Sequence, residues 1–86
     1  MNIEIGSVVI SKAGRDKGYF LFVKDIASDG VLVCDGKERP IERPKKKNPK
    51  HLAPTGYSLS AQEIATNRSL KRALSKYGVQ AESEVE

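Results

Sequence analysis

The segment from Gly6 to Val23 constrains the fold of this chain more than any other. Two apolar runs rich in β-branched and aromatic residues flank a five-residue connector, Gly14-Arg15-Asp16-Lys17-Gly18. Glycine adopts positive φ without steric cost, so the chain can reverse sharply between two strands. We therefore predict a β-hairpin with Arg15 and Lys17 exposed at its tip. The residues expected to form the turn are Gly14, Asp16 and Gly18.

Further short strands are expected around this hairpin. Its own strands are predicted over Val8 to Ser11 and Tyr19 to Ile26, and a third over Val31 to Cys34. The pair Asp35-Gly36 is a strong hairpin signal, which predicts a fourth strand over Lys37 to Ile41. Several short strands with closely spaced turns indicate a mainly β fold, a small barrel.

A basic, proline-rich segment follows these strands. Pro44, Pro49 and Pro54 bracket a lysine run, and the residue before each proline is pushed toward extended backbone. We expect an extended arm here, with a short closing strand at His51-Leu52 as an option. Residues 37–51 hold seven cations against two anions, whereas the whole chain holds 15 against 11. Such a stripe is typical of a nucleic-acid-binding protein, although a solvated loop would explain the charge alone equally well.

The apolar residues take a helical period beyond Ser60. Ser60 and Glu63 form a capping-box pattern, which predicts a helix start, and Leu59 and Ile64 are placed for a hydrophobic staple. The predicted helix has one apolar stripe, formed by Leu70, Ala73, Leu74 and Tyr77, and Gly78 is the expected stop. Its other face carries Arg68, Arg72 and Lys76. We favour simple exposure of these side chains to solvent over a contact with RNA.

The predicted strand from Tyr19 to Ile26 needs a cover on each side. Phe20 and Phe22 lie on one face, and Tyr19, Leu21 and Val23 lie on the other. One face must fill the barrel core, so we predict that the helix stripe covers the other. The expected organisation is a barrel with a basic arm over 1–55, a packed C-terminal helix over 56–78 and an acidic tail over 79–86.

Several functional classes are not expected from this composition. Cys34 is the single cysteine, which rules out an intrachain disulfide and a cysteine-based metal cluster, and we expect it to be buried. His51 is the single histidine and is more simply structural than a ligand. No paired-carboxylate, triad, P-loop or metal-ligand pattern is present, so neither an enzyme nor a cofactor is expected. No signal peptide or long apolar run is visible, which predicts a cytoplasmic protein without a membrane partner.

The hairpin segment also resembles a known motif. The positions that carry the resemblance are Gly6, Val8, Ile10, Gly14, Lys17, Gly18 and Val23, and they resemble the KOW motif of large-subunit ribosomal proteins and transcription elongation factors. The continuations Val31 to Lys37 and Pro44 to Leu52 are similar to the KOW branch related to archaeal and eukaryotic ribosomal proteins, including stand-alone bacterial members. The resemblance covers about residues 3–52 and implies an SH3-like β-barrel that binds ribosomal or other structured RNA.

These observations lead to one functional hypothesis and one alternative. The hypothesis is binding of structured RNA, above all ribosomal RNA, by a ribosome-associated or assembly-related protein, with ribosomal proteins as further partners. The RNA-binding residues predicted for it are Arg15, Lys17, Lys45, Lys46, Lys47 and Lys50. The alternative is an SH3-like protein-interaction module, such as a transcription-elongation-type KOW domain. That module would show an exposed aromatic groove in place of a contiguous basic face.

Overall fold

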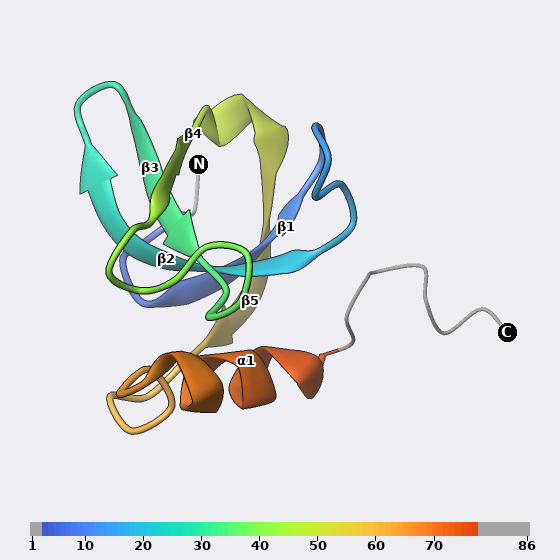
Figure 1. The fold of residues 1–86 in the computed structure, drawn as a ribbon. Coiled ribbons are helices and arrows are strands. Elements are labelled where there is room, and N and C mark those ends of the chain that lie inside the picture. The colour runs from blue at the N-terminus through green and yellow to red at the C-terminus, as the bar shows by residue number, and fades with distance from the viewer. Residues whose placement is uncertain (1–2, 78–86) are drawn as a thin grey trace, which may run out of the picture.

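The computed structural model describes residues 3–77 and consists of one antiparallel sheet and one α-helix (Figure 1). The strands are β1 (Ser7–Ser11), β2 (Phe20–Ala27), β3 (Gly30–Cys34), β4 (Lys45–Lys47) and β5 (Leu52–Ser58), in the spatial order β4-β3-β2-β1-β5. A single 3₁₀ turn, η1 (Pro49–His51), connects the two edge strands, and α1 covers Asn67–Ser75. The predicted mainly β fold with a C-terminal helix is confirmed, and the sheet is compatible with an SH3-like fold.

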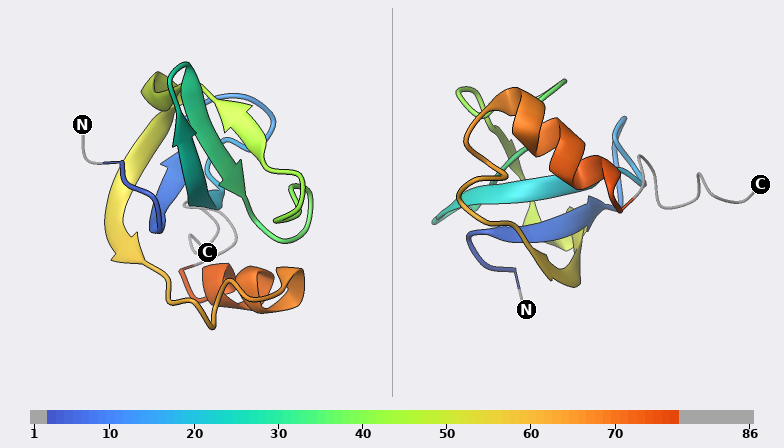
Figure 2. Two further views of the ribbon diagram at one scale, coloured as in Figure 1. Left: turned by 90° about the vertical axis from the view of Figure 1, so that its left-hand side faces the viewer. Right: turned by 90° about the horizontal axis from the view of Figure 1, so that it is seen from below.

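Two hydrophobic cores lie on opposite faces of β2. Leu21 and Val23 belong to the inner core of the curled sheet, together with Val9, Val31, Val33 and Leu52. Phe22, on the other face, packs with Leu70 and Leu74 of α1, and Phe20 and Tyr77 border this second core. Figure 2 shows α1 along this one side of the sheet. The prediction that the helix stripe covers the second face of the strand is therefore confirmed.

The helix starts later than the capping pattern at Ser60 predicts. Ser60 and Glu63 do exchange reciprocal hydrogen bonds, but these close an isolated turn. Thr66 then adopts extended backbone, with φ −136° and ψ 162°, and forms a second capping box with Ser69 that begins α1. The predicted stop at Gly78 and the predicted tail over 79–86 lie outside the described residues.

The predicted fourth strand over Lys37 to Ile41 is wrong. This segment is an irregular loop, because the Asp35 carboxylate accepts hydrogen bonds from the backbone N–H groups of Lys37 and Arg39 and closes it locally. The Ile41 N–H donates to Asn67 Oδ1 at 2.7 Å, which fixes the far end of the loop to the start of α1.

The fourth strand is instead β4, within the segment expected to be an arm. Its three lysines pair with β3 in antiparallel register, with Lys47 opposite Val31 and Lys45 opposite Val33. The segment is extended as expected, but it belongs to the sheet. Of the optional closing strand at His51-Leu52, Leu52 begins the longer β5, which pairs with β1, whereas His51 ends η1. The predicted arm is therefore a fixed part of the fold.

Candidate nucleic-acid interface

The connector between β1 and β2 is a tight, backbone-bonded turn. Gly14 and Gly18 both have a φ of 90°, in the region that favours glycine. The Gly18 N–H donates to the Ser11 carbonyl at 2.8 Å, and the Tyr19 N–H donates to the Asp16 carbonyl at 2.9 Å. Arg15 lies within this turn, and its side chain is exposed. The turn therefore presents its cations on a fixed backbone.

Lys47 and Asp16 form a largely buried ion pair beneath the turn. Lys47 Nζ lies 2.8 Å from Asp16 Oδ1, and the side chains are only 9% and 16% exposed. Ser11 Oγ also donates to Asp16 Oδ1, at 2.7 Å, and Lys47 Nζ donates to the Ala13 carbonyl at 3.2 Å. The Lys47 ammonium group is thus bonded inside the protein, where it fixes β4 to the turn.

The protonation of Asp16 follows from this environment. Burial by itself would raise the pKa of the Asp16 carboxyl. The hydrogen bonds from Lys47 and Ser11, together with the charge of Lys47, outweigh that effect and hold the pKa below its usual value. The carboxylate is therefore ionised near neutral pH and neutralises Lys47.

The turn and the segment around η1 lie side by side. The Lys12 N–H donates to the His51 carbonyl at 2.7 Å, and the Lys47 ion pair is a second link between the two segments. The exposed basic side chains gathered here define what we call the basic tip: Lys12, Arg15, Lys17, Lys50 and His51. Within 12–17 and 47–51 the only carboxylate is Asp16, which Lys47 neutralises. The connector and η1, which carry the basic tip, lie near one another at one end of the sheet (Figure 1), and the turn that holds Asp29 borders Asn48 and Pro49.

The six predicted RNA-binding cations do not all belong to this surface. Arg15, Lys17 and Lys50 belong to the basic tip, and Lys47 lies beneath it. Lys46 projects toward the β2–β3 turn, where it pairs with Asp29 at 2.8 Å in an exposed ion pair. Exposed pairs of this kind hold their cation weakly. Lys45 lies at the far end of β4, opposite Val33.

Lys12 was not among the predicted site residues. It directly follows β1, and it reaches the basic tip only because its backbone pairs with His51, which is 39 residues away in the sequence. The one sequence feature that could have indicated Lys12 as a site residue is its position next to the glycine-bounded connector.

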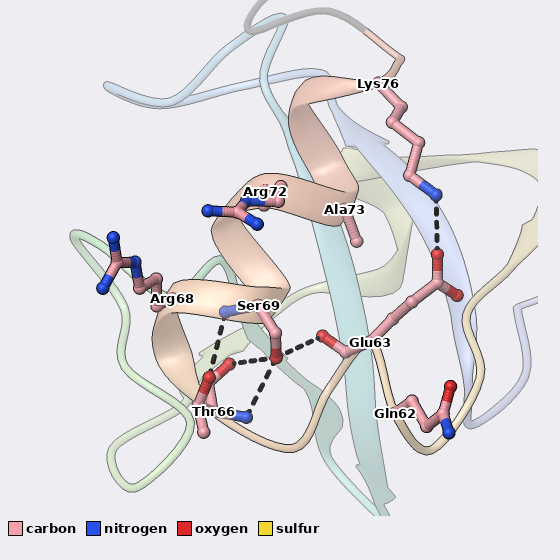
Figure 3. Close-up of a pocket in the computed structure, with 8 residues that line it drawn as sticks. All are labelled: Gln62, Glu63, Thr66, Arg68, Ser69, Arg72, Ala73 and Lys76. Atoms are coloured by element: carbon pink, nitrogen blue, oxygen red, sulfur yellow. Dashed lines mark hydrogen bonds and ion pairs between the residues drawn. The ribbon is translucent and has the colours of Figure 1, made fainter.

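A second cationic surface lies on α1, and Figure 3 shows the groove beside it. Arg68 and Arg72 extend from the same side of the helix in this view. Lys76 points the other way and pairs with Glu63 at 2.9 Å. The Glu63 carboxyl has a lowered pKa because it accepts hydrogen bonds from the Ser60 backbone and from Lys76.

The remaining candidate groups do not form a chemical centre. Cys34 is fully buried in β3, and burial raises the pKa of its thiol to about 11. No three or more histidine, cysteine, aspartate or glutamate side chains within 3–77 are grouped so that they could hold a metal ion. Over the same residues, no helix is both long and apolar enough to cross a membrane.

The fold and the basic tip define a small, cation-rich β domain with one packed helix. No sequence model of a known family matches the chain. The chain is 33% identical over 78 residues to the large ribosomal subunit protein eL14 of Desulfurococcus amylolyticus, an alignment that covers 90% of this chain and 81% of that protein. The chain belongs to the family of large ribosomal subunit protein eL14.

Proposed function

We propose that this protein binds structured RNA through the basic tip, and that its RNA is ribosomal RNA of the large subunit. The observation that carries the proposal is the convergence of Lys12, Arg15, Lys17 and Lys50 on one end of the fold. The relative's name, a large ribosomal subunit protein, supports the choice of RNA. So does the resemblance of Gly6 to Val23 to the KOW motif.

The chemistry of the basic tip suits a duplex backbone. Lysine and arginine side chains bind phosphates by releasing counterions, which gives affinity with little sequence preference. Double-stranded RNA is recognised mostly by its shape and its phosphates. The turn bearing Arg15 and Lys17 is fixed by the Lys47–Asp16 ion pair, so little backbone freedom is lost on binding.

The test is sedimentation of a cell lysate that contains the tagged chain. We expect the protein to migrate with large ribosomal subunits or their precursors, and Arg15→Gln/Lys17→Gln to shift it to the top of the gradient. Arg43→Gln/Lys76→Gln is the charge-matched control, because it removes two exposed cations outside the basic tip. A natural chain that stays at the top of the gradient, or two variants that sediment alike, would contradict the proposal.

The alternative protein-interaction module is favoured by one observation. Tyr57 is 50% exposed and stacks on Tyr77, with ring centroids 4.4 Å apart. Exposed aromatic side chains are enriched in protein interfaces. If Tyr57→Ala releases the chain from ribosomal fractions while Arg15→Gln/Lys17→Gln does not, this alternative is the better description.

A further inference from the structure

We propose that the exposed face of α1 is a second RNA-backbone-binding surface, so that one molecule of this protein bridges two RNA segments. The inference rests on the proposed function, because it assigns the same class of ligand to a separate surface. We call this surface the helix face and define it by Arg68, Lys71 and Arg72, all of which are exposed.

The charges around Arg68 are unfavourable for an isolated helix, whereas Arg72 in the last turn suits the helix dipole. Arg68 and Arg72 are four residues apart, and Lys71 is three residues from Arg68, so like charges are neighbours on one side. The first turn of the helix holds no acidic residue, and Arg68 lies there, near the positive end of the helix dipole. An anion placed over this side would remove both penalties.

The contrast with Lys76 shows that the helix face makes no ion pair with the described part of the chain, although Glu42 lies at the helix start and Lys71 lines a groove with Asp35 and Glu38. Lys76 has a carboxylate partner, Glu63, at 2.9 Å. No ion pair to Arg68, Lys71 or Arg72 occurs within residues 3–77. In Figure 3, Arg68 and Arg72 extend away from the Glu63–Lys76 pair. Their guanidinium groups are therefore available to phosphates, which guanidinium binds in a bidentate manner.

The helix face is also rigidly mounted. Leu70 and Leu74 anchor the opposite side of α1 in the second core. Asn67, at the start of the helix, accepts from the Ile41 N–H at 2.7 Å and donates to Glu42 Oε1 at 2.9 Å. The cations are thus displayed on a packed element and not on a free tail.

The two cationic surfaces lie on different sides of the molecule. Figures 1 and 2 show α1 beneath the sheet, whereas the β1–β2 connector and η1 lie at its upper end. The inner core, with Leu21 and Leu52, and the second core, with Phe22 and Leu70, separate them. An RNA duplex bound at the basic tip therefore leaves the helix face open to another segment.

The experiment mixes two 20-base-pair RNA duplexes, one labelled with a donor and one with an acceptor fluorophore, and adds the full chain. Energy transfer between the duplexes is the measure of bridging, and anisotropy of one duplex is the measure of single binding. We expect Arg68→Gln/Arg72→Gln to reduce energy transfer about fivefold or more while it changes the single-duplex affinity less than twofold. Arg43→Gln/Lys76→Gln should leave both close to the natural chain.

Each outcome decides a separate claim. A natural chain that binds neither duplex overturns the proposed function. Binding of one duplex without energy transfer overturns the bridging inference and leaves the proposed function standing. Energy transfer that persists in Arg68→Gln/Arg72→Gln also overturns the inference, because the bridge would then come from another surface or from self-association. The single variant Arg72→Gln, with half the charge change, should give an intermediate loss of energy transfer.

Discussion

Lys47 Nζ lies 2.8 Å from Asp16 Oδ1 and thereby joins edge strand β4 to the connector between β1 and β2. The two residues are 31 positions apart, and Ser11 completes the network from the end of β1. This one contact converts a glycine-bounded turn into a fixed platform for Arg15 and Lys17. It also leaves the Lys47 side chain only 9% exposed, whereas Lys45 and Lys46 are exposed.

We predict that Lys47→Met destabilises the fold by about 2–4 kcal/mol, because it leaves the Asp16 carboxylate largely buried without its partner. Asp16→Asn should cost less, since the amide oxygen can still accept hydrogen bonds from both Lys47 and Ser11, and Lys47 keeps the Ala13 carbonyl as an acceptor. Urea unfolding of both variants and of the double variant measures the coupling. If the two single effects simply add in the double variant, the two side chains do not interact as described.

The same carboxyl predicts a dependence of stability on pH. The pKa of Asp16 is lower in the folded state than in the unfolded state, so the ionised form favours folding. This contribution is complete above the unfolded pKa, near the usual value for aspartate, and it is lost as the pH falls toward the lowered folded pKa. Unfolding free energies measured from pH 6 to pH 2 should therefore fall less steeply for Asp16→Asn than for the natural chain. Parallel curves would contradict this role.

A comparison of two glycine substitutions tests the contact between the 35–43 loop and α1. Gly36 and Gly56 have nearly the same φ, 81° and 85°, but a Cβ on Gly36 would clash with the Asn67 carbonyl oxygen, whereas one on Gly56 meets open space. Gly56→Ala should cost about 1–2 kcal/mol, the usual penalty for positive φ. Gly36→Ala should cost clearly more, because the loop or the helix must also shift. Thermal unfolding measures both, and equal costs would mean that the loop does not press on α1.

Truncation of the helix stripe tests whether α1 belongs to the cooperative unit. Leu70→Ala and Leu74→Ala remove buried side chains from the second core, and each should cost about 2–5 kcal/mol. We expect a single unfolding transition at lower temperature by circular dichroism, with Arg72→Ala nearly unchanged as the exposed control on the same helix. A separate early transition of the helix would show that the sheet folds without it.

Cys34 should be chemically silent in the folded protein. Its thiol is fully buried and has a pKa of about 11, so little thiolate exists at pH 8. Ellman's reagent at pH 8 should react slowly with the native chain and at once in 6 M guanidinium chloride. Rapid reaction of the native chain would place Cys34 at the surface.

Much of the fold follows from local sequence pattern. The alternation along Tyr19 to Ile26 predicted two buried faces, and Leu21 and Phe22 do lie in different cores. The failures have a common physical origin in long-range contacts. The pair Asp35-Gly36 is typical of a hairpin turn, in which glycine adopts positive φ. In this structure the positive φ of Gly36 instead belongs to an irregular loop, which Asn67 at the start of α1 fixes by a hydrogen bond. No local sequence feature distinguishes a hairpin turn from such a loop.

The basic tip shows the same limit. The chemistry of Lys45, Lys46 and Lys47 is identical, so their sequence predicts one shared role. The register of β4 against β3 separates them, because Lys47 is opposite Val31 and turns toward Asp16, whereas Lys46 pairs with Asp29. Lys12 belongs to the basic tip because its backbone contacts His51, and no local sequence pattern predicts that contact.

The salt dependence of duplex RNA binding tests the central claim most directly. With about four phosphate contacts from Lys12, Arg15, Lys17 and Lys50, log K should fall against log salt with a slope of about −3 to −4, taking −0.9 per contact by analogy with B-DNA. Arg15→Gln/Lys17→Gln should make the slope shallower by about 1.8, and Arg43→Gln/Lys76→Gln should not change it. A flat salt response, or a slope that the Arg15→Gln/Lys17→Gln variant leaves unchanged, would contradict RNA binding through the basic tip.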